Sequence, residues 1–415
     1  MPSSSSPPPH IVVVGGGPAG VFAALTAAAS PNGSTVTLLE TEPMILRAWR
    51  SPGTLPGGLT REIWDPAEFA TLLGAGSKEM IGPLTRYGPG DFEAWLEEHD
   101  ADLQVDKNGR AHIRGTLPLD VALFFERKLA EADVNVRTSS TLRAVDIKST
   151  GGFWLTLADE RTLQVDQLIL AAGGLIANPT RRIVQDLGHT ITDCFPALTG
   201  FQSTDSRLRG VSGALDGQYE IRVGDTDHMA TGRIAIEAWG FSGPAVWELS
   251  TRQAHYLDKL HNRFPLRISW LPGGARMAAK LIEEQLRRFP SGRVGAFEDS
   301  RIPHRLWKNL LTSAKLSGEE TWDSLTPPLR SSLVRELASG EYEIVKKKNV
   351  RGVSSVLGGV TNDEVDFRTL ASRRVPGLYF AGDILDACGI GPAENLQIAW
   401  TTGWIAGSQA TDIGH

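Results

Sequence analysis

An α/β fold with a central parallel sheet is predicted by three observations on this 415-residue sequence. The apolar run 11–14 leads directly into a glycine-rich segment at 15–20. A second β-branched run occupies 35–39. Similar short runs at 167–170 and 375–380 end in small residues and glycines. Continuous apolar runs of this length are typical of strands buried on both faces between layers of helices.

The composition limits the class of protein. The chain is 41% apolar and 22% charged, which is ordinary for a globular protein and too long for a single core. Its net charge is −6, from 42 basic and 48 acidic residues, whereas nucleic-acid binders usually carry a basic excess. Cys194 and Cys388 are the two cysteines and have no metal-ligand or disulfide spacing, which fits a reducing, cytoplasmic compartment.

The N-terminal segment predicts a disordered leader at 1–8, rich in serine and proline. Residues 11–29 are apolar enough to suggest a membrane span, but three glycines and a proline interrupt them at 15–18. No lysine or arginine precedes Arg47, so the flanking charges of a signal peptide or span are missing. We expect a buried strand and helix here, with no membrane partner.

The strand at 11–14, the motif Gly15-x-Gly17-x-x-Gly20, the helix at 21–29 and the strand at 35–39 form a dinucleotide-binding fingerprint. Gly15 permits the tight turn, Gly17 lets the backbone approach a pyrophosphate, and Gly20 lets the helix pack closely on the strand. Glu40 follows the second strand and can accept hydrogen bonds from ribose hydroxyls. Because its charge would repel a 2′-phosphate, the fingerprint indicates FAD or NAD rather than NADP.

Two later segments favour FAD over NAD. The predicted strand at 167–170 leads into Ala171-Ala172-Gly173-Gly174, where small residues let the chain pass close to a dinucleotide. The strand at 375–383 ends in Gly382-Asp383, whose carboxylate can bond a ribityl hydroxyl. These segments recur with the fingerprint in FAD proteins of the glutathione-reductase-like superfamily. A helix from Asn395 to Ala410 follows, and its positive end is suited to the flavin N1/O2 region.

Further motifs give the chain a family resemblance. It resembles the BaiN-like flavoproteins, which include aminoacetone oxidase and a reductase of oxo-bile acids. The matching segments are Val14–Gly20, Asn108–Arg110, Ala171–Gly174, Leu187–Ile191 with Phe195–Leu198, Gly240–Val246, Gly358–Val360, and Val375–Asp383 with Asn395–Trp400. The ordered set is specific, although its single members are not.

The chain departs from that family around the flavin's reactive edge. Pro56–Thr60 lacks the family's Cys or Asn, and Ala238 stands where the family often has a histidine. Gly389–Glu394 replaces the usual Gly-Gly-Tyr before Asn-Leu-Gln. An intact FAD frame with changed surroundings suggests a changed substrate.

The resemblance implies a Rossmann-like FAD-binding domain with an inserted β-rich, barrel-like domain and a small helical subdomain. The FAD-binding domain would comprise 9–193 and 355–415, the β-rich insertion 194–274 and 339–354, and the helical subdomain 275–338. Alternation at 219–223 and 266–270 predicts strands, helical spacing predicts a helix at 277–289, and the lysines at 346–348 predict a solvated loop or edge strand.

The fingerprint, the later segments and the resemblance together predict the cofactor contacts. They are Gly15, Gly17, Pro18, Ala19, Gly20, Glu40, Arg47, Gly58, Leu59, Ala172, Gly173, Gly382, Asp383, Glu394, Asn395, Leu396 and Gln397. No metal site is indicated. Because flavin N5 accepts the hydride itself, few catalytic side chains are needed, and Glu394, Trp239 and Cys388 are the candidates. We expect a buried, inert Cys388 and therefore non-covalent FAD.

The predicted function is hydride transfer between a small organic substrate and flavin N5, as in an oxidase or dehydrogenase. An NAD(P)H-driven reductase of an activated C=C bond and a non-catalytic flavin sensor are the alternatives. No second glycine fingerprint marks a fixed NAD(P)H site, so NAD(P)H is expected only as a transient reductant. The substrate is expected near Gly57–Leu59, Cys388–Glu394 and Trp239, where the domains meet. The oligomeric state stays open.

Overall fold

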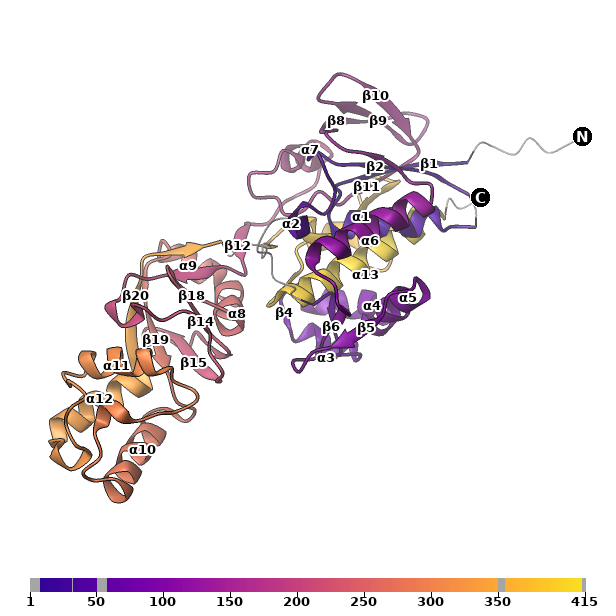
Figure 1. Ribbon diagram of the computed structural model, residues 1–415. Helices are drawn as coiled ribbons and strands as arrows, with labels where there is room; N and C mark the ends of the chain where they lie inside the picture. The colour runs from indigo at the N-terminus through magenta and orange to yellow at the C-terminus, as the bar shows by residue number, and fades with distance from the viewer. Residues whose placement is uncertain (1–7, 32, 51–57, 350–354, 413–415) are drawn as a thin grey trace, which may run out of the picture. The chain divides into compact units, whose positions relative to one another are not determined.

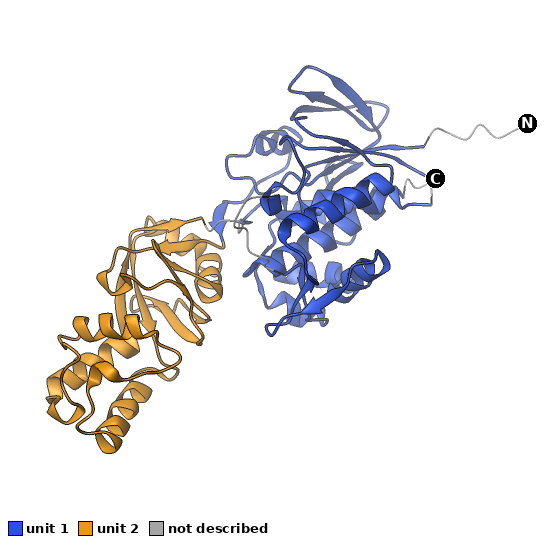
Figure 2. Cartoon of the chain, in the orientation of Figure 1, with its two compact units in different colours: residues 1–197, 351–415 blue, residues 198–350 orange. Residues whose placement is uncertain are grey.

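The computed structural model describes residues 8–31, 33–50, 58–349 and 355–412. Most of the predicted leader at 1–8, Gly57 and the segment 350–354 lie outside the described residues. The chain forms two compact units, which comprise residues 1–197 with 351–415 and residues 198–350 (Figure 2). Each unit surrounds its own hydrophobic cluster.

The first unit is built on a seven-stranded sheet in which β1 lies between β2 and β11, parallel to both (Figure 1). Ile11 to Val14 are all buried, because helices cover the sheet, and this explains the continuous apolar run. In spatial order the strands are β23 (Val365–Asp366), β24 (Ala371–Ser372), β25 (Leu378–Phe380), β11 (Gln167–Leu170), β1 (His10–Val14), β2 (Thr35–Leu39) and β7 (Asn135–Arg137). The strands predicted at 11–14, 35–39 and 167–170 are thus confirmed.

Helices α1 (Pro18–Ala28) and α13 (Pro392–Ala410) lie side by side against this sheet (Figure 1). A Cβ atom on Gly403 or Gly407 would fall 2.5 Å from the Ala19 carbonyl oxygen or 2.4 Å from that of Ala23. The two glycines therefore set the distance between the helices. Helix α13 begins three residues before the predicted Asn395, because Gly391 caps it and Pro392 fits its first turn.

Smaller sheets and helices complete the first unit. Its remaining strands are β8 (Leu142–Ile147), β9 (Phe153–Leu157) and β10 (Thr162–Val165); β3 (Thr60–Arg61), β5 (Leu103–Val105) and β6 (Arg110–Ile113); β4 (Leu73–Ala75) with β26 (Cys388–Gly389); and β12 (Phe195–Ala197) with β22 (Ser355–Leu357). Its other helices are α2 (Arg47–Arg50), α3 (Pro66–Ala70), α4 (Ser77–Arg86), α5 (Pro89–Glu98), α6 (Pro118–Glu131) and α7 (Thr180–Asp186).

The second unit contains two sheets and five α-helices within its described residues. One sheet has the order β14 (Gly213–Ala214), β17 (Ala235–Glu237), β18 (Gly240–Ser242), β13 (Gly200–Gln202) and β21 (Lys346–Lys348). The other has the order β16 (Met229–Gly232), β15 (Tyr219–Val223), β19 (Phe264–Ser269) and β20 (Gly340–Ile344). The helices are α8 (Pro244–Arg252), α9 (Ala254–Lys259), α10 (Gly274–Arg288), α11 (His304–Ser313) and α12 (Pro327–Ser339).

The sequence patterns of this unit correspond closely to its elements. The strand predicted at 219–223 is confirmed, and its buried residues alternate with half-buried ones. The strand predicted at 266–270 runs from Phe264 to Ser269, and the predicted helix at 277–289 begins earlier, at Gly274. The three lysines form edge strand β21. One hydrophobic cluster joins the strands to helices α10 to α12.

Candidate active site

The glycine fingerprint occupies the turn between β1 and α1. Gly15 has a φ of +111°, and a Cβ atom there would lie 2.3 Å from the Ala171 carbonyl oxygen. A Cβ atom on Gly20 would lie only 1.8 Å from the Gly15 carbonyl oxygen. By contrast, nothing lies within 4 Å of the corresponding position on Gly17, the N-terminal cap of α1. Gly17 therefore borders open space at a positive helix end, where a pyrophosphate fits.

Pro18 and Ala19 form the first turn of this helix, and Ala19 also contacts the C-terminal part of the chain. Proline is favourable at this position, because its missing N–H would have no partner within the helix. A Cβ atom on Gly382 would lie 2.7 Å from that of Ala19. The helix start and the Gly382 turn are thereby in direct contact.

Glu40 lies directly after β2, beside the glycine turn. Its carboxylate accepts a hydrogen bond from the Gly16 N–H at 2.6 Å and another from the Glu42 N–H at 2.7 Å. These bonds fix the carboxylate, and each oxygen keeps a second lone pair for a ribose hydroxyl. Arg47, the first residue of α2, is exposed and pairs with Glu42.

The Ala172–Gly173 segment turns sharply after β11. Gly173 has a φ of +78°, and a Cβ atom there would have nothing within 4 Å. The side chain of Asn178 fixes the turn, since its amide donates to the Ala172 carbonyl at 2.8 Å and to the Gly174 carbonyl at 3.2 Å. The turn thus leaves a second open backbone surface at the end of a central strand.

Asp383 follows the Gly382 turn and is half-buried. The Gly382 N–H donates to the Thr402 hydroxyl at 2.9 Å, and the Ser355 hydroxyl donates to the Asp383 carboxylate at 3.1 Å. Desolvation raises the pKa of Asp383 to about 6, although the hydrogen bonds from Ser355 and the Val356 backbone oppose the rise. A half-buried carboxylate with spare acceptor capacity is suited to a ribityl hydroxyl.

Gly58, Leu59 and Thr60 connect to the N-terminal part of α13 through polar groups. Gly58 has a φ of +81°, and the Leu59 carbonyl accepts from the Trp400 indole N–H at 2.8 Å. The Thr60 hydroxyl donates to the Gln397 side-chain oxygen at 2.5 Å, and the Gln397 amide donates to the Thr401 hydroxyl at 3.0 Å. The side chains of Thr60, Gln397 and Thr401 are all buried.

Glu394 lies in the first turn of α13 and is buried, with 4% of its side chain exposed. Its carboxylate pairs with the Arg61 guanidinium at 2.6 Å. The neighbouring Asn395 holds the preceding loop, because its amide donates to the carbonyls of Gly389 and Gly391 at 3.0 and 2.9 Å. The sequence analysis missed Arg61, whose partner is 333 positions away along the chain.

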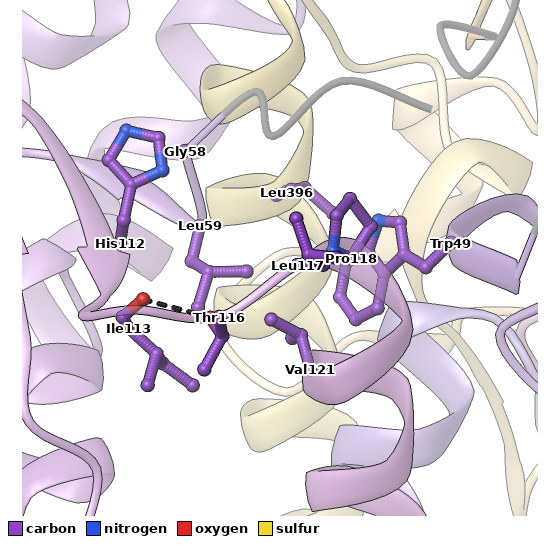
Figure 3. A pocket seen from close by; sticks show the side chains of 10 residues that line it. All are labelled: Trp49, Gly58, Leu59, His112, Ile113, Thr116, Leu117, Pro118, Val121 and Leu396. Atoms are coloured by element: carbon purple, nitrogen blue, oxygen red, sulfur yellow. Dashed lines mark hydrogen bonds between the residues drawn. The ribbon is translucent and has the colours of Figure 1, made fainter. Parts of the chain in front are cut away.

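A small pocket, partly open to solvent, adjoins these residues (Figure 3). Its lining includes three predicted cofactor contacts, Gly58, Leu59 and Leu396. The other lining residues are Trp49, His112, Ile113, Thr116, Leu117, Pro118 and Val121. The sequence analysis missed His112, whose only sequence signal is its place two residues after the matched segment Asn108–Arg110.

The three catalytic candidates lie in different environments. Glu394 is paired with Arg61, as described above. Cys388 is buried in β26, and burial raises the pKa of its thiol, which disfavours the thiolate. Trp239 lies in the second unit, where its ring covers Gly200 and the Lys348 ammonium lies 5.1 Å from the ring centre. Within the described residues, no group of three potential ligand side chains is arranged to hold a metal ion.

The described residues of the first unit fit FAD. Open backbone at Gly17 and Gly173 leaves room for a dinucleotide, and the Glu40 carboxylate, the N-terminus of α1 and Asp383 offer partners for ribose, phosphate and ribityl groups. The arrangement is that of a flavoprotein rather than of a protein that merely contains a glycine-rich turn.

Comparison with known proteins agrees with this fit. The family model of the HI0933-like protein Rossmann domain matches residues 9–409, so the chain belongs to that family of FAD-binding proteins. It is 26% identical over 405 residues to a 3-dehydro-bile acid Δ(4,6)-reductase of Clostridium scindens, covering 95% of this chain and 97% of that one. A ribosomal RNA dihydrouridine synthase of Escherichia coli is 24% identical over 290 residues, which cover 66% and 67% of the two chains.

Solved structures share the fold. A 3-ketosteroid-Δ4-(5α)-dehydrogenase of Rhodococcus jostii superposes with a TM-score of 0.53 at 14% identity, covering 99% of this chain and 98% of that one. A 3-ketosteroid Δ1-dehydrogenase of Sterolibacterium denitrificans gives 0.51 at 11% identity, covering 97% and 99%. These structures support the fold, whereas the family match and the reductase relative show the chain to be an FAD-dependent oxidoreductase, as the sequence predicted. Among the helices that the structure describes, none combines the length and apolarity that crossing a membrane requires.

Proposed function

We propose that this flavoprotein reduces a C=C bond next to a carbonyl group in a small, mostly apolar substrate, with NAD(P)H as a transient reductant. The pocket beside Gly58, Leu59 and Leu396 carries the proposal, because apolar side chains dominate its wall and a polar side chain is provided by His112. The relatives support the reductive direction, since the names of both curated relatives denote the addition of hydrogen to a double bond in a ring.

The predicted contacts assign parts of the cofactor to parts of the first unit. We assign the adenosine ribose to Glu40, the pyrophosphate to Gly15–Gly20, and the ribityl chain to Asp383. The isoalloxazine belongs with Gly58, Leu59 and the start of α13, from Glu394 to Gln397. When bound, FAD supplies a hydride acceptor and donor at N5. Arg47, Ala172 and Gly173 border the same sites, and the inert Cys388 leaves the cofactor non-covalent.

The chain's own residues then hold and orient the reactants. The ion pair of Glu394 with Arg61 and the chain of hydrogen bonds from Thr60 to Thr401 fix the start of α13, whose positive end stabilises negative charge on the reduced cofactor. The apolar wall of the pocket excludes water and aligns a flat ring. Glu394 thus serves to position the helix in this proposal, and Trp239 remains a candidate for substrate choice.

Anaerobic half-reactions test the direction of the chemistry. The yellow holoenzyme should bleach with NADH or NADPH and regain its colour when 2-cyclohexen-1-one or 4-androstene-3,17-dione is added, with formation of the saturated ketone. An oxidase or dehydrogenase would instead bleach with the reduced substrate alone, and recovery only with oxygen would contradict the proposal. A colourless protein that cannot be loaded with FAD would overturn the cofactor assignment as well.

Binding of the cofactor is tested separately. Glu40→Arg should weaken FAD binding at least ten-fold, because it removes the ribose acceptor and introduces bulk. Glu68→Arg makes the same charge change at an exposed position on helix α3 and should retain FAD. Acid denaturation should release all of the flavin, whereas a yellow precipitate would indicate a covalent link.

A small organic substrate and a cytoplasmic location are parts of the same proposal. The net charge of −6 supports a substrate other than nucleic acid. Because the Escherichia coli relative is named for its action on ribosomal RNA, a ribosomal RNA transcript belongs in the substrate panel. Formation of dihydrouridine in that transcript, with no turnover of the enones, would replace the small substrate by RNA.

A further inference from the structure

His112 is a titratable group that the sequence analysis did not assign. Of the ten described residues that line the pocket, it alone carries a titratable side chain (Figure 3). It lies on β6, which pairs with β3, the strand that carries Thr60 and Arg61. The same short sheet therefore connects His112 with the residues that hold the start of α13.

The two ring nitrogens of His112 have different surroundings. Nε2 lies 3.5 Å from the Asp106 carboxylate, whereas Nδ1 has no hydrogen-bond partner among the described residues. About 18% of the side chain is exposed. In the protonated imidazolium form, Nε2–H can face the Asp106 carboxylate while Nδ1–H can be given to a molecule in the pocket.

Hydrogen bonds from the backbone favour the ionised form of Asp106. Burial raises its pKa, but the backbone N–H groups of Asn108 and Arg110 donate to its carboxylate at 2.7 and 3.1 Å, and the net effect is a pKa below the usual value. The hairpin that carries His112 also carries Lys107 and Arg110, and the guanidinium of Arg61 on the neighbouring strand β3 is paired with Glu394. Asp106 is thus a fixed negative charge behind the imidazole.

We propose that His112 is the proton donor of the reduction and that Asp106 is its positioning residue. This inference rests on the proposed function and names the acid of that same site. The substrate gains a hydride from the reduced cofactor at the carbon remote from its carbonyl, and a proton from His112 Nδ1 at the adjacent carbon. The hydride that bound FAD would supply and the proton of His112 together convert the C=C bond into a single bond; NAD(P)H would replenish the hydride, and a proton from solvent restores the imidazolium.

The substrate class follows from the same wall. Leu59, Ile113, Val121 and Leu396 offer apolar contact, and Trp49 offers an aromatic one. A cyclic enone places its apolar ring against these side chains and its conjugated carbonyl system near Nδ1. A strongly charged or sugar-like substrate would leave its polar groups without partners there.

The test separates the two half-reactions of the flavin-loaded enzyme. His112→Gln should retain FAD and its rate of bleaching by NADH, but the rate of reoxidation by 2-cyclohexen-1-one should fall by about 10²- to 10⁴-fold, the usual contribution of an acid–base group. One ionisation should disappear from the pH profile of that step. The control His99→Gln replaces a histidine that bonds the Trp95 carbonyl outside the pocket, and it should change neither rate.

Asp106→Asn should lower the reoxidation rate less than His112→Gln does, and it should change the position of the ionisation rather than remove it. A purely structural role would reduce FAD content or thermal stability in both variants and leave the profile unchanged. Equal reoxidation rates in wild type and His112→Gln would overturn the proposal.

A binding experiment covers the case in which the wild-type enzyme reduces no enone, which would contradict the proposed function. The probe is 4-hydroxybenzaldehyde, a flat ring with an acidic hydroxyl that changes absorbance when it ionises. Binding as the phenolate should be at least ten-fold weaker in His112→Ala and unchanged in His99→Gln. Absence of binding, or binding that ignores His112, overturns the assignment of this pocket.

Discussion

The two ends of the proposed FAD site are built in different ways. At the nucleotide end, which comprises Gly15–Gly20 and Glu40, the fit comes from backbone shape and from residues at most 25 positions apart. At the flavin end, which comprises Thr60, Arg61 and Glu394–Gln397, it comes from the pairing of polar side chains more than 300 positions apart, Thr60 with Gln397 and Arg61 with Glu394. The nucleotide end therefore depends on the absence of side chains, and the flavin end depends on their exact pairing.

This difference has an energetic consequence. An added atom at the nucleotide end collides with backbone that cannot move without shifting β1 or α1. A lost atom at the flavin end leaves a buried donor or acceptor without a partner, which costs about 1–3 kcal/mol. The two ends should therefore respond oppositely to substitutions that add bulk and to those that remove polar groups.

Gly20→Ala should have the largest effect on the free energy of unfolding. Its Cβ atom would lie 1.8 Å from the Gly15 carbonyl oxygen, so α1 must move away from β1. We expect a loss of about 3 kcal/mol, the upper end of the cost of overpacking. Urea unfolding of the flavin-free protein measures it. The control Gly82→Ala adds the same atom within helix α4, where the backbone is helical and nothing lies within 4 Å, and a similar loss there would refute the steric explanation.

Asp383 should make the stability of the flavin-free protein depend on pH. Burial raises its pKa from 3.8 to about 6, so the folded state holds a proton that the unfolded state releases near pH 4. The stabilisation is full below pH 4 and is lost as the pH rises to about 6, a change of ~3 kcal/mol. Urea unfolding of wild type and Asp383→Asn at pH 4.5 and 7 should show this loss only in wild type. An identical pH dependence in the two proteins would contradict it.

Gln397→Leu should destabilise the protein by about 2 kcal/mol, because the buried hydroxyls of Thr60 and Thr401 lose partners at 2.5 and 3.0 Å. Thermal and urea unfolding measure the loss. Gln409→Leu makes the same change at the other end of α13, where the side chain is half-buried. It should lower the free energy of unfolding by less than about 0.5 kcal/mol, the usual range for substitutions near the surface. Equal effects would show that helix propensity, not pairing, determines the result.

The same contrast explains what the sequence could predict. The spacing of Gly15, Gly17 and Gly20 and the position of Glu40 follow from the geometry of one βαβ unit, so the strands, the helix and the role of each glycine were predictable. The start of α13 was missed by three residues, because Pro392 and Gly391 mark it more directly than the motif Asn395–Gln397 does.

The partners at the flavin end could not be predicted from local patterns. Arg61 has no sequence feature that relates it to Glu394, and only the fold brings β3 to the start of α13. His112 stands in a short strand whose alternation resembles that of many hairpins, and its importance depends on the pocket beside it. Long-range pairing of single polar residues leaves no periodic signal in a single sequence.

Gly17 offers the sharpest test of the comparison, because its substitution should have the smallest effect on stability and a large effect on the cofactor. No atom lies within 4 Å of an added Cβ, and its φ of −78° suits any residue. Gly17→Val should therefore lower the free energy of unfolding of the flavin-free protein by no more than about 1 kcal/mol, the usual cost of a poorer N-cap residue where no contact is disturbed. The side chain would fill the space assigned to the pyrophosphate, and the purified variant should be colourless. Absorbance at 450 nm after incubation with excess FAD, together with urea unfolding, measures both properties. A yellow, fully loaded variant would place the pyrophosphate elsewhere, and a colourless variant with lowered stability would assign Gly17 the same structural role as Gly20.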